Sequence, residues 1–176
     1  MHIEIGSGKG TFLVSQAAAF PEINYLGIEW ANKYCRYAAD RLARRGLRQV
    51  RLIRTDAAAF IAGLVPLDSV EMVHIYFPDP WPKKRHHKRR FFCQRNLELL
   101  LERLVCGGII NAATDHADYF DQMQAAADWA EKTGRAEQID FIRPAGAAEG
   151  EKVGTNYERK YQKEGRVTYT LALRKR

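Results

Sequence analysis

Short apolar runs alternate with longer stretches of helical periodicity along most of this chain. The leucines at positions 97, 100, 101 and 104 have the spacing of one helix face packed against a sheet. The apolar runs predict strands at residues 2–5, 25–28, 50–53, 70–76 and 109–113. The periodic stretches predict helices at residues 12–20, 31–45, 57–64, 91–104 and 119–132. Because strands and helices alternate with short connections, we expect a doubly wound α/β fold whose sheet is mostly parallel.

The last part of the chain continues this pattern less regularly. Two further strands are expected near residues 136–142 and 167–173. The intervening stretch, 143–166, is polar and rich in Gly, Ala and charged residues, so we interpret it as a mobile surface loop. Gly107 and Gly108 are expected to end the helix at 91–104. At 176 residues the chain has the length of one ordinary domain, 1–176.

The composition narrows the class of protein. With 46% hydrophobic and 28% charged residues it is that of a globular protein, and no apolar run approaches the ~20 residues of a membrane span. The first residues have no signal-peptide pattern. Three cysteines without C-x-x-C spacing fit a reducing compartment, so we expect a cytoplasmic protein. We also expect a monomer or a homodimer without a membrane partner.

The positive charge is concentrated in one place. The formal net charge is +7, and residues 83–90 read K-K-R-H-H-K-R-R, with no acid among them. Such a patch neutralises several adjacent phosphates at once, which indicates a polyanionic partner. The alternative is a solvated, charged loop that opens a helix.

A proline-rich segment, P-D-P-W-P at 78–82, precedes the basic block. Each proline fixes its own φ and keeps the preceding residue out of the helical region, so the segment is stiff. It follows the strand at 70–76, and the carboxyl ends of strands are where open α/β sheets bind ligands. We therefore expect Asp79 and Trp81 to be presented at a working edge, with Trp81 either stacking on a base or packed under the loop.

A glycine turn follows the first strand, with the pattern E-x-G-x-G-x-G formed by Glu4, Gly6, Gly8 and Gly10. Glycines let the backbone approach a ligand closely. A nicotinamide fingerprint is spaced G-x-G-x-x-G instead, and the Glu4 carboxylate would repel a pyrophosphate. The same carboxylate can hold an ammonium group, which favours a cofactor that is cationic at this end, such as S-adenosylmethionine. The alternative is a tight turn without a ligand.

Two more acids are expected at the ends of the next strands. Glu29 follows the second strand, where an acid can accept hydrogen bonds from ribose hydroxyls. Asp56 follows the third, where a carboxylate can accept from an adenine amino group. Either acid alone is more often a helix cap, but three acids at successive strand ends beside a glycine turn favour cofactor binding.

Five blocks together resemble the tRNA (guanine-N7-)-methyltransferase family, in order and over nearly the whole chain. They are E-I-G-S-G-K-G at 4–10, G-I-E at 27–29, F-P-D-P-W-P-K-K-R-H-H-K-R-R at 77–90, A-T-D at 113–115 and T-N-Y-E at 155–158. The block at 77–90 is highly specific, whereas the glycine motif alone indicates only a class I methyltransferase. The resemblance implies a Rossmann-like, seven-stranded sheet with an antiparallel last strand. It also implies S-adenosylmethionine as methyl donor and a guanine in the tRNA variable loop as acceptor.

The resemblance also implies roles for individual residues. Glu4, Glu29 and Asp56, with the turn glycines Gly6, Gly8 and Gly10, contact the cofactor. Asp79 is the catalytic residue, at the junction of cofactor and guanine. The residues that match substrate-contacting positions are Lys83, Asp115, Thr155, Asn156, Tyr157 and Glu158. Those that match the RNA-contacting stretch are Arg85, His86, His87, Lys88, Arg89 and Arg90. Family members usually carry an extension before the first strand, whereas here Met1 stands just before Glu4.

The expected reaction needs little help from acid or base groups, because guanine N7 is already a nucleophile at neutral pH. We therefore expect catalysis by orientation, with Asp79 accepting hydrogen bonds from the guanine N1 and exocyclic amine. Cations in the late loop, Arg159, Lys160, Lys163 and Arg166, suggest a lid over the nucleoside.

No histidine spacing indicates a metal site. The competing interpretations are a nicotinamide-dependent oxidoreductase of the same fold and an RNA-binding protein without catalysis.

Overall fold

The computed structural model describes residues 1–176 and contains one seven-stranded sheet with the order β3-β2-β1-β4-β5-β7-β6. The strands are β1 (His2–Ile5), β2 (Tyr25–Ile28), β3 (Val50–Ile53), β4 (Val70–Tyr76), β5 (Leu104–Thr114), β6 (Ala136–Ile139) and β7 (Tyr169–Lys175). Strands β1 to β5 pair in parallel, whereas β7 is antiparallel to both β5 and β6. The expected fold class, including the antiparallel last strand, is confirmed.

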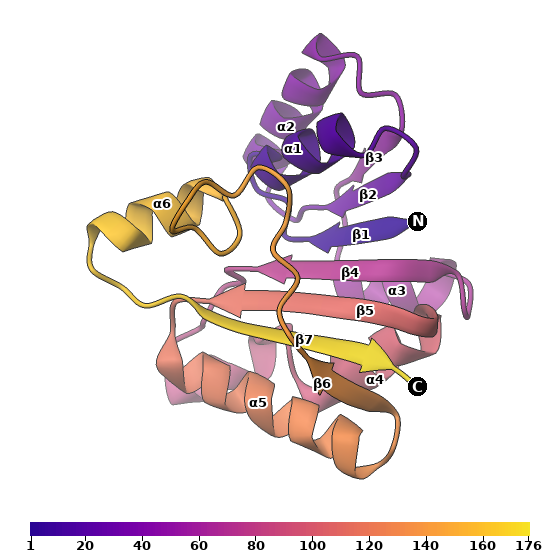
Figure 1. The fold of residues 1–176 in the computed structure, drawn as a ribbon, viewed down its shortest axis with the longest axis vertical. Helices are drawn as coiled ribbons and strands as arrows, with labels where there is room; N and C mark the ends of the chain where they lie inside the picture. Colours follow the sequence, from indigo (N-terminus) through magenta and orange to yellow (C-terminus); the bar gives the residue numbers. More distant parts are fainter.

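The helices divide between the two faces of the sheet (Figure 1). They are α1 (Thr11–Ala19), α2 (Asn32–Arg44), α3 (Ala57–Leu64), α4 (Gln94–Arg103), α5 (Ala117–Lys132) and α6 (Asn156–Lys163), with a 3-10 helix η1 (Lys84–Arg89). Helices α1 and α2 lie on one face, over β1 to β3, and α3, α4 and α5 lie on the other. None of the helices is both long and apolar enough to cross a membrane.

The alternation of side chains along β4 shows why both faces are covered. Val73 and Ile75 join the larger core cluster, which packs against α3, α4 and α5. His74 and Tyr76 point the other way and contact Phe12 of α1, with ring centres 4.5 and 5.1 Å from the Phe12 ring. From Val73 to Tyr76 the strand is buried on both sides, and His74 is the one polar residue in that run.

Besides shifts of a few residues at the ends of other elements, two features differ from the sequence prediction. Strand β5 begins at Leu104, so Gly107 and Gly108 lie inside the strand and do not end α4. The register of β4 and β5 shifts between Val70 and Met72, which accommodates this glycine pair as an irregularity in the ladder.

The second difference is α6, which lies inside the segment 143–166 that the sequence predicts as a loop. Thr155 caps the helix, its side chain accepting a hydrogen bond from the N–H of Glu158. In Figure 1, α6 lies beyond the carboxyl ends of the parallel strands.

The strand order places a topological switch point between β1 and β4. From β1 the sheet runs through β2 to β3 on one side and through β4 to β5 on the other. Ligands of open α/β sheets bind at such a point, outside the carboxyl ends of the strands. The glycine turn follows β1 and the proline-rich segment follows β4, so both predicted motifs flank this point.

Candidate functional site

The turn after β1 depends on its glycines. Gly6, Gly8 and Gly10 all have positive φ, at 77°, 50° and 70°. At Gly10 an added Cβ would also lie 2.9 Å from the Cβ of Ala38 on α2. A side chain at this position would therefore be strained and would push α1 and α2 apart, so glycine is required.

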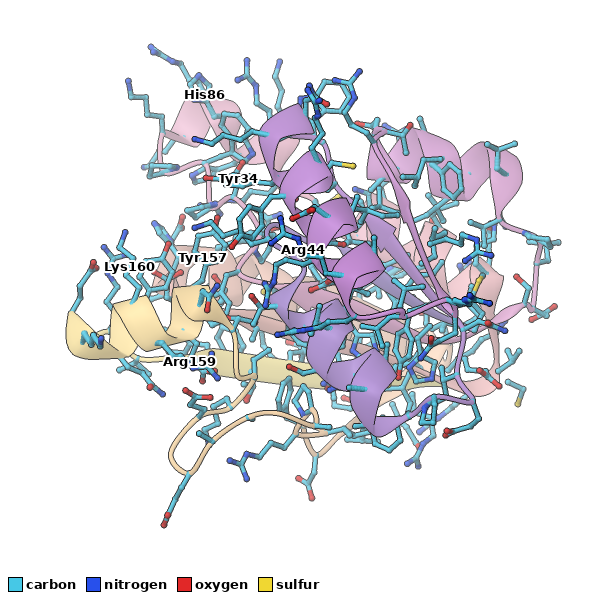
Figure 2. All side chains as sticks on the ribbon, turned by 90° about the horizontal axis from the view of Figure 1, so that it is seen from above. Tyr34, Arg44, His86, Tyr157, Arg159 and Lys160 are labelled. Carbon is cyan, nitrogen blue, oxygen red and sulfur yellow. The ribbon has the colours of Figure 1, made fainter.

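A cavity of about 210 Å³ lies over this turn. Its lining comes from the β1 end, the glycine turn, β4, the start of α2 and α6: Glu4, Gly6, Ser7, Gly8, Lys9, Thr11, Phe12, Tyr34, Tyr76, Thr155, Asn156, Tyr157 and Lys160. Figure 2 shows Tyr34 on α2 and Tyr157 on α6 close together, with Lys160 further along α6. Segments more than a hundred residues apart in sequence thus form one pocket.

Glu4 is the most unusual group in this pocket. Its side chain is 4% exposed, and its Oε2 atom is buried without a hydrogen-bond partner. Burial raises the pKa of Glu4 to about 8, and the nearby charge of Glu29 adds to the shift. A buried carboxyl group without a partner is costly unless a ligand supplies one. The site therefore fits a cationic group, such as an ammonium, next to the turn.

Glu29 and Asp56 have structural partners of their own. Glu29 is 8% exposed; its Oε2 accepts from the N–H of Gly8 and its Oε1 from the N–H of Ala31, each at 2.7 Å. It thereby ties the glycine turn to the end of β2. Asp56 is exposed and caps α3, with Oδ1 accepting from the N–H of Ala59 at 2.8 Å. Neither acid lines the cavity.

The proline-rich segment is held in an uncommon backbone conformation. Phe77 and Trp81 have positive φ, at 51° and 44°, a region that non-glycine residues rarely adopt. The N–H of Phe77 donates to the carbonyl of Ala113 on β5 at 2.8 Å, which fixes the segment to the sheet. Asp79 lies between the two strained residues and is exposed. Strain of this kind is concentrated at functional sites.

The structure corrects the assignment of Arg90 to the RNA-contacting residues. Its side chain is 1% exposed and lies with its guanidinium 4.9 Å from the ring centre of Tyr119. The Nε atom donates to the carbonyl of Pro80 at 2.7 Å, and the terminal nitrogens donate to Asp118 and Gln122. Since its donors are used inside the protein, Arg90 fastens the proline-rich segment to α5.

The remaining cations of the basic block lie at the surface, and their predicted contacts with RNA stay a prediction. Lys83, Lys84, Arg85, Lys88 and Arg89 are exposed, and His86 and His87 are half-buried. Trp81 lies between the Arg89 guanidinium, 4.9 Å from its ring centre, and the perpendicular His86 ring at 5.9 Å. The indole therefore supports η1, which agrees with the packed alternative for Trp81.

Glu158 is also placed differently from the prediction, which put it among the substrate-contacting residues. It is fully buried, and its carboxylate accepts from the N–H groups of Lys152, Val153 and Gly154. Glu158 thus orders the segment before α6 and does not face a ligand. Thr155, Asn156 and Tyr157 do line the cavity. Asn156 also donates to the hydroxyl of Thr11 at 3.0 Å, which joins α6 to α1.

Asp115 follows β5 and pairs with Arg166, which the sequence analysis placed in a lid. Their atoms are 2.8 Å apart, and the Arg166 guanidinium lies 4.6 Å from the ring centre of Tyr161 on α6. Burial raises the pKa of Tyr161, and the charges of Asp115 and Asp79 raise it further. The end of α6 thus lies close to both predicted acids.

Several residues of the pocket are not predicted from the sequence, among them Lys9, Tyr34 and Tyr76. Lys9 lies within the glycine turn and Tyr76 ends β4, so their positions next to the two predicted motifs could have identified both residues. The Tyr76 hydroxyl is held by His74 and Asn111, each at 2.9 Å, in a buried polar network. Tyr34 enters the pocket only because α2 packs beside α1.

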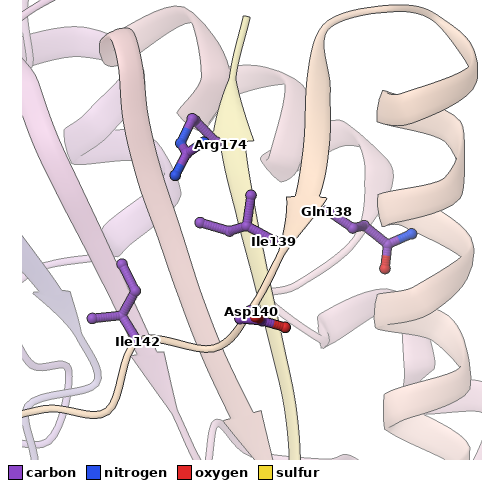
Figure 3. A pocket seen from close by; sticks show the side chains of 5 residues that line it. All are labelled: Gln138, Ile139, Asp140, Ile142 and Arg174. Carbon is purple, nitrogen blue, oxygen red and sulfur yellow. The ribbon is translucent and has the colours of Figure 1, made fainter.

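A second depression lies on the sheet near β6 and β7 (Figure 3). Its five lining residues are Gln138, Ile139, Asp140, Ile142 and Arg174. It lies away from the glycine turn and the proline-rich segment, and Arg174 is paired with Glu137 at 3.2 Å. It holds no strained backbone or buried acid that would suggest chemistry.

The fold and the glycine turn with Glu4 beside it agree with a class I methyltransferase, and the match to a known family establishes this class. The chain matches the family described as "Putative methyltransferase" over residues 1–171. The structure superposes on a SAM dependent methyltransferase from Aquifex aeolicus with a TM-score of 0.63, covering 99% of this chain and 81% of that one. At 10% identity this likeness concerns the fold alone.

Curated relatives specify the family further. The chain is 39% identical to the tRNA (guanine-N(7)-)-methyltransferase of Halorhodospira halophila, over 99% of this chain and 74% of that protein. It is 37% identical to the enzyme of the same name from Alkalilimnicola ehrlichii, over 99% and 72%. The chain belongs to the tRNA (guanine-N7-)-methyltransferase family. This membership rules out the nicotinamide-dependent oxidoreductase and the RNA-binding protein without catalysis.

Proposed function

We propose that this protein transfers a methyl group from S-adenosylmethionine to N7 of a guanine in the variable loop of tRNA. The observation that carries the proposal is the buried carboxyl of Glu4 at the glycine turn, whose Oε2 has no hydrogen-bond partner, beside the strained segment that presents Asp79. The ammonium group of a cationic cofactor supplies the hydrogen-bond donor that this oxygen lacks. The proposal places the reaction in the cytoplasm, where tRNA is processed.

The residues around the turn are suited to hold the cofactor. Glu4 binds its ammonium group, and the turn glycines Gly6, Gly8 and Gly10 let its methionine portion approach the backbone. Glu29 has lone pairs left after its two backbone contacts and is positioned for the ribose hydroxyls. The free Oδ2 of Asp56 is available to the adenine amino group. When bound, S-adenosylmethionine supplies an electrophilic methyl group on its sulfonium.

Asp79 is assigned the central role on the acceptor side. Guanine N7 carries a lone pair, so the protein has to orient the base and does not have to deprotonate it. The Asp79 carboxylate accepts hydrogen bonds from the guanine N1 and exocyclic amine, and its charge favours the cation that develops on the ring. We assign Lys83, Asp115, Thr155, Asn156 and Tyr157 to the surrounding nucleoside contacts.

The exposed part of the basic block is assigned to the RNA backbone. Arg85, Lys88 and Arg89 face solvent at the same edge of the sheet as Asp79, with His86 and His87 beside them. Phosphate contacts of this kind position an RNA without reading its sequence. Arg90 is left out of this group because its side chain is buried.

Asp79→Ala tests the proposal. We expect methylation of tRNA to fall by about 10²–10³-fold, as when a preorganised hydrogen-bonding group is removed from an active site. Cofactor affinity, measured by calorimetry, is expected to stay near the wild-type value. Transfer of a labelled methyl group to bulk tRNA, followed by identification of the modified base, gives the rate and the product together.

The matched control is Asp121→Ala, which removes an exposed carboxylate from α5. It is expected to retain full activity. Wild-type methylation by Asp79→Ala, with normal cofactor binding, would disprove the role of Asp79. A labelled base other than N7-methylguanine would disprove the proposed reaction.

A further inference from the structure

The start of α2 carries a positive surface that neither the cavity nor the basic block explains. We define the α2 basic face as Lys33, Arg36 and Tyr37 of α2 with Lys9 of the glycine turn. All four residues are exposed. Lys33, Arg36 and Tyr37 share one face of the helix, since they are three and four positions apart. The Nζ atom of Lys9 lies 5.9 Å from the ring centre of Tyr37, which joins the turn to this face.

The cations of this face have no carboxylate partner. The ion pair of α2 joins Arg44 to Asp40, near the other end of the helix. The first turn of α2 contains no acid. Since the amino end of a helix carries partial positive charge, Lys33 lies where a cation destabilises the helix. Helix stability therefore does not account for these residues, whereas an anionic ligand does.

The face is continuous with the rim of the cavity. Tyr34 follows Lys33 in the sequence and lines the cavity, as Lys9 does. In Figure 2, Tyr34 and Tyr157 lie together, with Lys160 of α6 on one side of them and His86 of η1 on the other. A polynucleotide that delivers one nucleoside to this cavity therefore extends over α2, α6 or η1.

We propose that the α2 basic face binds the tRNA strand adjacent to the target guanine. Lys33 and Arg36 contact phosphates, and Tyr37, which is 51% exposed, contacts a neighbouring base. Exposed aromatic rings among cations are the usual means of holding unpaired nucleic acid. An acidic protein surface would satisfy the cations but would leave the exposed ring beside them unexplained. The inference rests on the proposed function, because it takes tRNA as the ligand.

The test compares two double variants that each remove two exposed cations. Lys33→Gln/Arg36→Gln changes the α2 basic face. Arg95→Gln/Lys132→Gln changes α4 and α5 on the opposite face of the sheet (Figure 1). The measurements are the Kd for tRNA at several salt concentrations, the KM for tRNA and kcat. Cofactor affinity and thermal stability show whether either variant perturbs the fold.

For the α2 variant we expect the slope of log K against log salt to become shallower by roughly 1.4–1.8, as for the loss of two phosphate contacts. The same loss weakens tRNA binding by roughly 25–60-fold at about 0.1 M salt. KM for tRNA is expected to rise in parallel, with kcat at saturating tRNA and cofactor affinity unchanged. The α4/α5 variant is expected to match the wild type.

A slope equal to that of the wild type, or an equal loss in the α4/α5 variant, would overturn the proposal. The proposed function is judged separately, from N7-methylguanine formed by the wild-type protein in the same preparations. If tRNA binds through α2 but no N7-methylguanine forms, the proposed activity fails and the binding face stands. If N7-methylguanine forms and the α2 variant binds normally, only the binding face fails.

Discussion

Individual side chains decide the chemistry of this site more than composition does. Glu4 and Glu29 are both buried acids at strand ends, yet Glu29 has backbone partners for both oxygens while Glu4 has a buried oxygen with none. The two carboxyl groups therefore have different roles. Glu29 holds the turn in shape, and Glu4 keeps a vacant acceptor that favours a cationic ligand.

The pKa of Glu4 leads to a prediction about pH. Burial raises this pKa to about 8 from an ordinary value of 4.5, so between these values the folded protein keeps a proton that the unfolded chain has lost. The free energy of unfolding of the ligand-free protein is therefore expected to fall as the pH rises through this window. Cofactor affinity is expected to rise over the same window, because the carboxylate is the form that holds an ammonium group.

Thermal denaturation and cofactor titration from about pH 5 to 8 check both trends. Glu4→Gln is expected to flatten the stability profile and to weaken cofactor binding at high pH. Glu22→Gln, which changes an exposed acid, serves as the control. If the Glu4→Gln protein keeps the wild-type pH dependence, the origin of the effect lies in another group.

Among the elements, α6 contributes most unexpectedly to the site. The segment before it is fixed by three N–H groups that donate to Glu158, and by Arg143, which donates to the carbonyls of Ala147, Ala148 and Glu151. These contacts hold Tyr157 over the glycine turn, where an added Cβ on Gly8 would lie 3.7 Å from its ring. A polar, glycine-rich sequence can therefore still form an ordered side of the cavity.

Removal of the Glu158 carboxylate should destabilise the segment before α6. In Glu158→Ala the three N–H groups lose their acceptor, at a cost of about 1–3 kcal/mol for each buried donor left unsatisfied. We expect faster hydrogen exchange across residues 152–158 and cofactor affinity at least ~10-fold lower, since α6 contributes to the cavity wall. In Glu164→Ala only exposed ion pairs are lost, worth about 0–1 kcal/mol, and exchange is expected to stay slow. Equal exchange in both variants would contradict the anchoring role.

Across the molecule, the exposed cations of three elements gather around the carboxyl ends of the parallel strands. The exposed cations of η1, the start of α2 and α6 lie around one cavity, whereas Arg90 and Arg103 are largely enclosed by protein contacts. Net charge alone, at +7, does not distinguish these two groups. The field that attracts a polyanion depends on the exposed group.

Two variants of the basic block separate these groups. Arg85→Gln/Lys88→Gln is expected to weaken tRNA binding and to flatten its salt dependence by roughly 1.4–1.8 in log–log slope. Arg90→Gln is expected to leave the slope unchanged and to lower stability by about 1–3 kcal/mol, because the carbonyl of Pro80 loses its donor. Salt-dependent binding and denaturant unfolding measure the two effects. A flattened slope in Arg90→Gln would restore this residue to the RNA-binding group.

Much of the architecture and the site could be read from local patterns. Apolar periodicity located β1 to β4 closely, and the glycines, the prolines and the three acids predicted from their positions after strands do lie at one edge of the sheet. These features were readable because strand and turn preferences act over a few neighbouring residues. The helix α6 was not readable in this way, since its segment is polar and its helical form is supported by contacts with distant parts of the chain.

The amino-acid sequence alone therefore predicts a doubly wound sheet, a glycine turn with an acid beside it, and a stiff segment that carries Asp79. Folding in three dimensions decided that Arg90 and Glu158 turn inward while their neighbours face solvent. It also brought Tyr34 and Tyr157 together above the turn. The physical reason is that local conformation follows from adjacent residues, whereas burial and hydrogen-bond partners depend on segments that meet only in the folded chain.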